Sequence, residues 1–217
     1  ETIYRSLFVQ ARGALRKELT SCLRSGRVQR RAPQRTEQSG TGHLRGMVSI
    51  SDRPAEALDR AIPGHWEGDL IIGKGGRSAI GTLVERASRF LVLLHLPHGR
   101  TAELVRDALT RQLAKLPAEL RRTLTWDQGS EMAEHVQFTV DTDIDVYFCD
   151  PHSPWQRGSN ENTNGLLRQY FPTSTDLTTH TKADLNAVAR ELNNRPRQTL
   201  NWMKPSEVFS RFVASTD

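Results

Sequence analysis

The order of the apolar segments after residue 64 is the feature that most narrows the possible folds of this 217-residue chain. Short segments rich in β-branched residues and bounded by tight turns predict three consecutive strands, at 65–73, 78–87 and 89–96. Helical spacing and further short apolar runs then predict alternating helices and strands, at 101–116, 122–127, 132–141, 144–149 and 159–170. Two more helices are expected, at 181–193 and from Pro205 to Val213. This order predicts a mixed five-stranded α/β sheet flanked by helices.

Three acidic residues stand at positions of this pattern where a carboxylate is unfavourable. Asp69 lies within a strand expected to be buried, although strands are depleted in aspartate. Asp127 ends another strand just before a Gln-Gly turn, and Glu161 opens a helix in an Asn-rich stretch. Buried carboxylates are normally paired or bound to metal, because an unpaired buried charge is costly. The three acids are therefore predicted to share a divalent-metal site that acts on phosphodiesters.

The proposed sheet would bring these acids together although they are far apart in the chain. Asp69 would lie on the central strand, Asp127 at the end of its neighbour, and Glu161 on a helix packed across the sheet. Carboxylate oxygens favour Mg²⁺, or Mn²⁺ in its place, over zinc. Each acid also has a structural reading: backbone donors would satisfy Asp69, Asp127 would cap its turn, and Glu161 would be a first-turn acid favoured by the helix dipole.

Other candidate ligands fit a metal site less well. Glu67 shares a strand face with Asp69, and we interpret it as an acid at the surface or behind the metal ligands. The acidic run at 141–145 imitates a calcium loop but lacks the required glycine and glutamate. Cys149 and His152 have a zinc-like spacing without a second ligand pair, so a zinc site is not expected.

The N-terminal quarter of the chain is basic, whereas the remainder is close to neutral. Residues 1–53 contain 11 Lys and Arg against 4 Asp and Glu, while the whole chain has a net charge of +5. Apolar spacing predicts a helix within 1–24, and the Arg-, Ser- and Gly-rich segment 25–63 is typical of a basic linker that is mobile without DNA. Such an arm indicates nucleic-acid binding, through residues such as Arg30 and Arg31. A solvated basic linker is the alternative.

Three further features of the sequence bear on the kind of protein from which the chain comes. It begins at Glu1 in helix-like sequence, so we expect it to be a fragment. Two cysteines, Cys22 and Cys149, form no disulfide framework, which fits a reducing cytoplasm. The sequence has no apolar stretch of the length that a membrane span requires.

Three motifs resemble those of bacterial transposases of the insertion-sequence-thirty group, whose catalytic core belongs to the integrase and DDE superfamily. They are GHWEGD at 64–69, TWDQG at 125–129 and PWQRGSNENTNGLLRQYFP at 154–172. The third motif is highly specific, and the resemblance extends over nearly the whole chain. The chain departs from the group's pattern at Ser130 and at Thr173-Ser174, where basic residues or Lys-Gly are usual, and this loss of charge would weaken DNA contacts.

This resemblance implies an RNase H-like catalytic core at 64–217, preceded by the helix and the basic linker. It implies that Asp69, Asp127 and Glu161 bind Mg²⁺, with Mn²⁺ as a substitute, and that an upstream helix-turn-helix recognises the element's terminal repeats. The implied partners are double-stranded DNA of the element ends and target, bound by a homodimer or higher multimer at the bacterial nucleoid in the cytoplasm. Besides the basic arm, we expect DNA contacts from Arg157, Asn164, Arg168, Arg195 and Arg197, although a plain surface role fits each arginine equally well.

The function expected from these observations is a DNA transposase that cleaves element ends and joins the 3′-hydroxyl to target DNA by two-metal phosphoryl transfer. Two alternatives remain open. One is a non-catalytic, DNA-binding regulatory derivative of a transposase, and the other is a metal-dependent nuclease without strand transfer.

Overall fold

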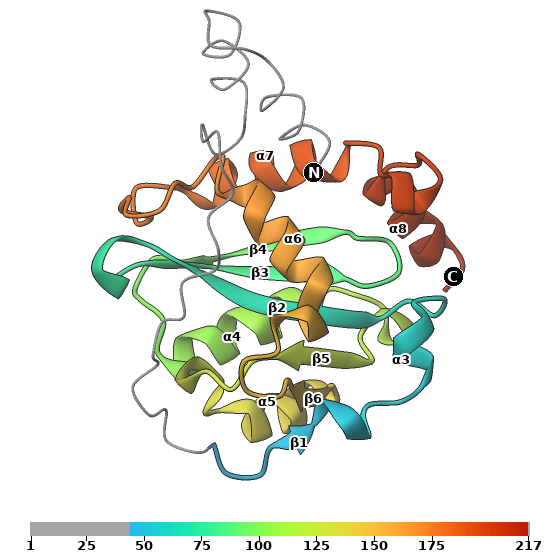
Figure 1. Cartoon of the computed structure of the whole chain (residues 1–217), viewed down its shortest axis with the longest axis horizontal. Helices are drawn as coiled ribbons and strands as arrows, with labels where there is room; N and C mark the ends of the chain where they lie inside the picture. Colours follow the sequence, from blue (N-terminus) through green and yellow to red (C-terminus); the bar gives the residue numbers. More distant parts are fainter. Residues whose placement is uncertain (1–43, 217) are drawn as a thin grey trace, which may run out of the picture. The chain divides into compact units, whose positions relative to one another are not determined.

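The structure, a computed structural model, describes residues 44–216 and has a six-stranded mixed sheet at its centre (Figure 1). The strand order is β1-β6-β5-β2-β3-β4. The strands are β1 (Val48–Ser49), β2 (His65–Ile72), β3 (Ala79–Glu85), β4 (Leu91–Leu96), β5 (Thr123–Trp126) and β6 (Asp145–Phe148). β2, β3 and β4 form an antiparallel meander, whereas β5, β6 and β1 join the other side of β2 as parallel strands.

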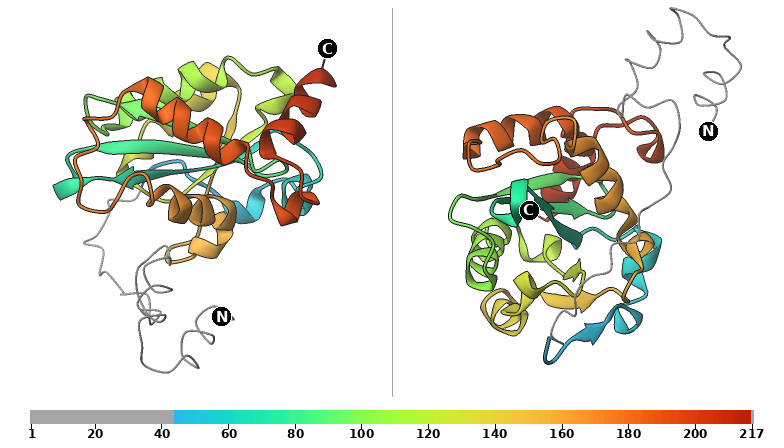
Figure 2. Two further views of the ribbon diagram at one scale, coloured as in Figure 1. Left: turned by 90° about the horizontal axis from the view of Figure 1, so that it is seen from above. Right: turned by 60° about the vertical axis from the view of Figure 1, so that its left-hand side comes forward.

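Helices cover both faces of this sheet (Figure 2). The α-helices of the described residues are α3 (Glu56–Asp59), α4 (Ala102–Leu113), α5 (His135–Thr142), α6 (Gly158–Leu167), α7 (Lys182–Asn193) and α8 (Pro205–Ala214). One apolar cluster joins α4, α5 and α8 to one sheet face, and a second joins α6 and α7 to the opposite face. Within 44–216 no helix has the length and apolar character needed to cross a membrane.

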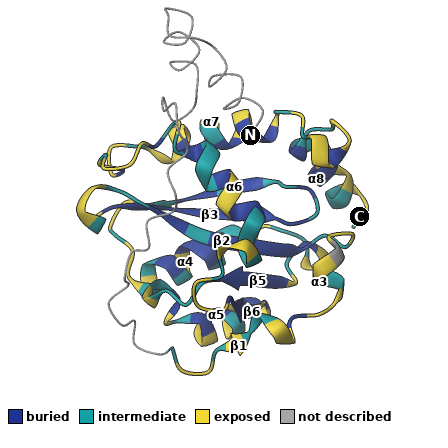
Figure 3. Ribbon diagram, in the orientation of Figure 1, coloured by how far each residue is buried: buried dark blue, intermediate teal, exposed yellow. Residues whose placement is uncertain are grey.

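The alternation of side chains along β2 explains why both faces are covered. Trp66 and Leu70 point into the cluster beneath α4, while Ile71 points into the cluster beneath α7. Because β2 is central and buried along nearly its whole length, its few polar residues must find partners inside the protein (Figure 3). This requirement applies to Glu67 and Asp69.

The predicted mixed sheet and flanking helices are confirmed, and the arrangement is consistent with an integrase core of the RNase H-like kind. The expected number of five strands is wrong, because β1 adds a sixth. β1 was missed because it is two residues long, lies in the segment taken as a linker, and is defined only by its pairing with Tyr147 and Phe148 of β6. The predicted helix within 1–24, together with Arg30 and Arg31, lies outside the described residues.

A buried histidine at the start of β2 predicts a pH-dependent stability. Burial lowers the pKa of His65 to about 4, against an ordinary value of 6.5, and its Nδ1 lies 2.9 Å from Thr123 Oγ1. The unfolded chain therefore binds a proton between these pH values that the folded protein excludes, and stability falls as pH falls through this range. We expect the free energy of unfolding to drop by about 2 kcal/mol between pH 7 and pH 5 from this residue.

Urea denaturation at the two pH values measures this effect. The variant His65→Gln should show a smaller drop than the parent, since it lacks the titrating group. An equal drop in both proteins would show that other groups cause the pH dependence.

Candidate functional site

Asp69 and Asp127 lie on the same face of two neighbouring strands. Asp69 is in β2, and Asp127 directly follows β5, which pairs with β2 in parallel from His65 to Glu67. On the opposite face, Gly68 leaves a gap that the buried indole of Trp126 fills. A Cβ atom at Gly68 would lie 2.0 Å from Trp126 Cζ3, so only glycine permits this approach. The close packing of these two residues sets the relative positions of the two acids that follow them.

The carboxylates of Asp69 and Asp127 have matching sets of partners. One oxygen of each is held by a backbone amide: Leu70 N donates to Asp69 Oδ1 at 2.8 Å, and Gly129 N donates to Asp127 Oδ1 at 3.2 Å. The other oxygen of each faces Arg157. The guanidinium lies 3.4 Å from Asp69 Oδ2 and 3.2 Å from Asp127 Oδ2. One acid in β2 and one directly after β5 thus each present their second oxygen to the Arg157 guanidinium.

The electrostatics of this group favour a bound positive charge. Burial raises the pKa of Asp69, Arg157 opposes that rise, and the neighbouring Asp127 adds to it. Burial alone would lower the pKa of Arg157, but the two carboxylates outweigh it and raise that pKa. Arg157 also donates to Gly68 O at 2.7 Å, so the side chain is fixed to β2 as well. The arginine therefore neutralises acids that would otherwise repel one another.

Helix α6 crosses β2 and β3 and carries the third acid (Figure 1). Asn164 Nδ2 donates to Asp69 Oδ2 at 3.0 Å, while Asn164 Oδ1 is buried without a hydrogen-bond partner among the described residues. Glu161 is exposed and lies on the same helix face, one turn from both Arg157 and Asn164. In the part of the chain that the structure describes, no three His, Cys, Asp or Glu side chains are placed closely enough to hold a metal ion. The structure brings Asp69 and Asp127 together and leaves Glu161 apart from them.

The donors present nevertheless have the chemistry of a magnesium site. Two carboxylate oxygens already converge on the Arg157 guanidinium, and the unpartnered Asn164 Oδ1 is a third oxygen beside them. Hard oxygen donors of this kind suit Mg²⁺ or Mn²⁺. A divalent cation would fit these residues if the Arg157 side chain moved away from the two aspartates and Glu161 turned toward them.

Glu67 is not at the surface, and this part of the interpretation is wrong. It is fully buried and paired with Arg86, whose Nη1 lies 2.6 Å from Glu67 Oε1. Its other oxygen accepts a hydrogen bond from the backbone of Asn160 in α6. Both oxygens of Glu67 therefore have protein partners.

The other arginines predicted to contact DNA form no hydrogen bond to the three site acids within 44–216. Arg168 donates to Ile72 O at 3.3 Å, and Arg197 donates to Leu192 O at 3.3 Å. Arg195 pairs with Glu191 and the Tyr170 hydroxyl. These bonds give each arginine a structural role, and contact with DNA stays a prediction for all of them.

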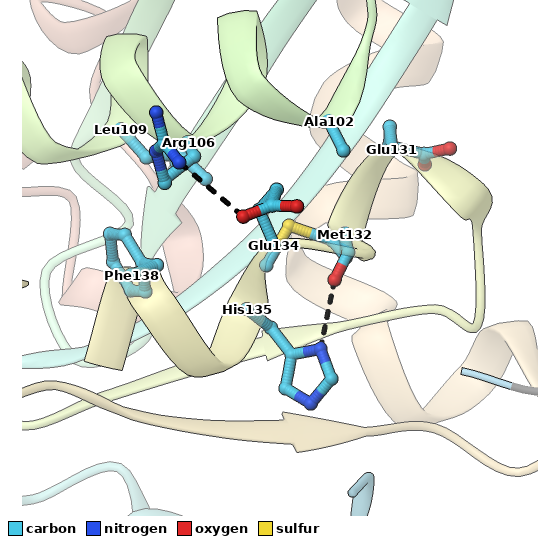
Figure 4. A pocket seen from close by; sticks show the side chains of 8 residues that line it. All are labelled: Ala102, Arg106, Leu109, Glu131, Met132, Glu134, His135 and Phe138. Atoms are coloured by element: carbon cyan, nitrogen blue, oxygen red, sulfur yellow. Dashed lines mark hydrogen bonds and ion pairs between the residues drawn. The ribbon is translucent and has the colours of Figure 1, made fainter. Parts of the chain in front are cut away.

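A crevice between α4 and α5 is unrelated to the acidic site (Figure 4). Arg106 and Glu134 form an ion pair at 3.4 Å beside it, and His135 Nδ1 lies 2.9 Å from Met132 O. Its lining includes none of Asp69, Asp127 and Glu161.

Sequence reasoning did not find the role of Arg157 as the partner of the acids, nor the burial of Glu67. The signal for Arg157 was its position four residues before Glu161 on one helix face. For Glu67 the signal was its place inside a strand expected to be buried. Neither signal identifies the partner, because each partner comes from a distant part of the chain.

Comparison with known proteins gives consistent matches over this region. The family described as Integrase core domain matches residues 59–154, which include Asp69 and Asp127. A transposase for insertion sequence element IS1086 from Cupriavidus metallidurans is 50% identical over 215 residues, covering 99% of this chain and 63% of that protein. Transposase InsI for insertion sequence element IS30C from Escherichia coli is 47% identical over 219 residues, covering 100% of this chain and 57% of that protein.

A more distant relative is a transposase for insertion sequence element IS4351 from Bacteroides fragilis. It is 37% identical over 215 residues, which cover 98% of this chain and 64% of that protein. The chain therefore spans less than two thirds of the length of these relatives.

Proposed function

Because this chain belongs to the insertion-sequence-thirty group of transposases and carries an integrase core domain, we propose that it cleaves DNA strands at the ends of a mobile element and joins the freed 3′-hydroxyl to target DNA. The observation that carries the proposal is that Asp69 Oδ2 and Asp127 Oδ2 converge on the guanidinium of Arg157, at the start of α6. Acids held this way by backbone amides are pre-positioned for phosphodiester chemistry.

We assign the binding of Mg²⁺, or Mn²⁺ in its place, to Asp69, Asp127 and Glu161. Such ions supply activation of the attacking oxygen and charge stabilisation of the leaving oxygen. The amides of Leu70 and Gly129 keep each aspartate from rotating, and Asn164 orients Asp69 through Oδ2. Arg157, released from the acids, is free to contact a phosphate of the DNA backbone.

Supporting contacts to double-stranded DNA are proposed for Asn164, Arg168, Arg195, Arg197 and the basic arm with Arg30 and Arg31. A multimer on paired element ends, acting on nucleoid DNA in a bacterial cytoplasm, is part of the same proposal. Affinity for DNA should fall steeply as salt rises, because phosphate contacts release counterions.

A strand-cleavage and strand-joining assay on labelled duplex DNA tests the proposal. With Mg²⁺ or Mn²⁺ we expect nicked products, and with pre-cut 3′-hydroxyl ends we expect joined products. Cleavage without joining would indicate a metal-dependent nuclease. Binding to DNA without either product would indicate a non-catalytic regulatory derivative, and both outcomes contradict the proposal.

A further inference from the structure

The buried acid Glu67 is connected to the catalytic helix rather than to solvent. Its side chain is 0% exposed, and Oε2 accepts a hydrogen bond of 2.9 Å from Asn160 N. Asn160 is the third residue of α6, where the backbone N–H groups have no partner inside the helix. The N-cap residue Arg157 makes no side-chain capping bond. Glu67 therefore supplies from the sheet the acceptor and negative charge that a helix start requires.

The side chain of Asn160 fixes the same helix turn to two strands. Asn160 Nδ2 donates to Glu67 O at 2.9 Å in β2 and lies 3.3 Å from Thr82 O in β3. Thr82 Oγ1 in turn donates to Asn160 Oδ1 at 3.0 Å. One bond would set only the distance of α6 from the sheet, whereas bonds to backbone and side chain on two strands also prevent the helix from rotating.

The rotation of α6 about its own axis determines where its site residues point. Asn160 is fully buried against the sheet, and Glu161 is the next residue along the helix. Successive helix residues project about 100° apart, so fixing Asn160 fixes the direction of Glu161 as well. Arg157 and Asn164, on the face shared with Glu161, both reach Asp69.

We propose that Glu67, together with Asn160, positions the site by holding α6 so that Glu161 lies on the helix face from which its side chain can turn toward Asp69 and Asp127. Glu67 does not itself bind the metal, because Arg86 and Asn160 N already engage its oxygens. This inference rests on the proposed function for its effect on cleavage, but the anchoring of α6 is measurable without it.

Two matched double variants isolate the capping bond. Both Glu67→Gln/Arg86→Met and Glu67→Leu/Arg86→Met remove the buried ion pair, and replacing both partners of such a pair is tolerated far better than removing one. They differ only at residue 67, where Gln keeps an oxygen for Asn160 N–H and Leu does not. The first readout is hydrogen exchange at the first-turn amides of α6, and the second is the cleavage rate at saturating DNA.

With Leu, we expect first-turn amides to exchange about tenfold faster or more, while β2 and β5 amides are unchanged. The turnover rate should fall about 100-fold, because small displacements of catalytic groups have effects of that size, while DNA affinity stays within about twofold. With Gln, exchange and turnover should both be within about threefold of the parent. Unchanged exchange or unchanged turnover in the Leu variant would overturn the proposal.

A third variant covers the case in which the Leu variant does not fold. Asn160→Ala keeps Glu67, Arg86 and the backbone amide but removes the side-chain bonds to both strands. It should show the same loss of turnover, and normal cleavage by it would overturn the proposal. If the parent chain itself does not cleave DNA, the proposed function fails, whereas the exchange experiment still decides whether Glu67 anchors α6.

Discussion

Replacing Asp127 by Asn is expected to reduce strand cleavage and joining by at least about 10³-fold, the rate equivalent of losing about 4 kcal/mol of transition-state stabilisation. The amide has nearly the same shape, so Gly129 N keeps an acceptor. The variant loses the negative charge of Asp127, whose Oδ2 lies 3.2 Å from the Arg157 guanidinium and is the oxygen that we propose would bind the metal. Cleavage rates at fixed Mg²⁺, compared with DNA affinity by filter binding, measure the effect.

The control is Asp141→Asn, the same chemical change at an exposed residue of α5. It should leave cleavage unchanged, and both variants should bind DNA nearly as well as the parent. If the Asp127 variant cleaves within tenfold of the parent rate, Asp127 is not a metal ligand.

The substitution Gly68→Ala is expected to destabilise the fold strongly, although it adds only one methyl group. The new Cβ would lie 2.0 and 2.2 Å from two ring carbons of Trp126, whose side chain is fully buried in the core. Overpacking of this kind typically costs 1–3 kcal/mol and occasionally more, so we expect about 3 kcal/mol. The melting temperature should fall by about 10 °C for a domain of this size.

Gly158→Ala is the matched control, since a Cβ there has no neighbour within 4 Å and the residue begins α6. Its free energy of unfolding should change by less than about 0.5 kcal/mol. Adding Trp126→Leu to Gly68→Ala should recover part of the lost stability, because the smaller leucine side chain removes the ring carbons with which the new Cβ clashes. Equal melting temperatures for Gly68→Ala and Gly158→Ala would contradict the packing argument.

Local sequence patterns were sufficient to predict most of the sheet and its helices. The meander of β2, β3 and β4 follows from short apolar segments and tight turns, and the start of α8 at Pro205 follows from helix-start chemistry. β1 could not be predicted, because two residues show no periodicity and the strand exists only through its pairing with β6.

The nearness of Asp69 and Asp127 was predictable from the sequence, whereas their contacts were not. Asp69 and Asp127 stand out in the sequence because acids are unusual in and directly after buried strands, and the structure places both beside the Arg157 guanidinium. The bridging by Arg157 and the pairing of Glu67 with Arg86 and Asn160 depend on tertiary packing between distant segments. No local pattern in the sequence encodes such a pairing.

The central claim is that Asp69, Asp127 and Glu161 gather around a divalent cation. Anomalous diffraction from crystals of the 217-residue chain grown in Mn²⁺ tests it directly. We predict a manganese peak bound by Asp69 Oδ2 and Asp127 Oδ2, with Glu161 turned toward it and Arg157 displaced from both acids. A map in which Arg157 still bridges the two carboxylates, with no manganese beside them at millimolar metal, would contradict the claim.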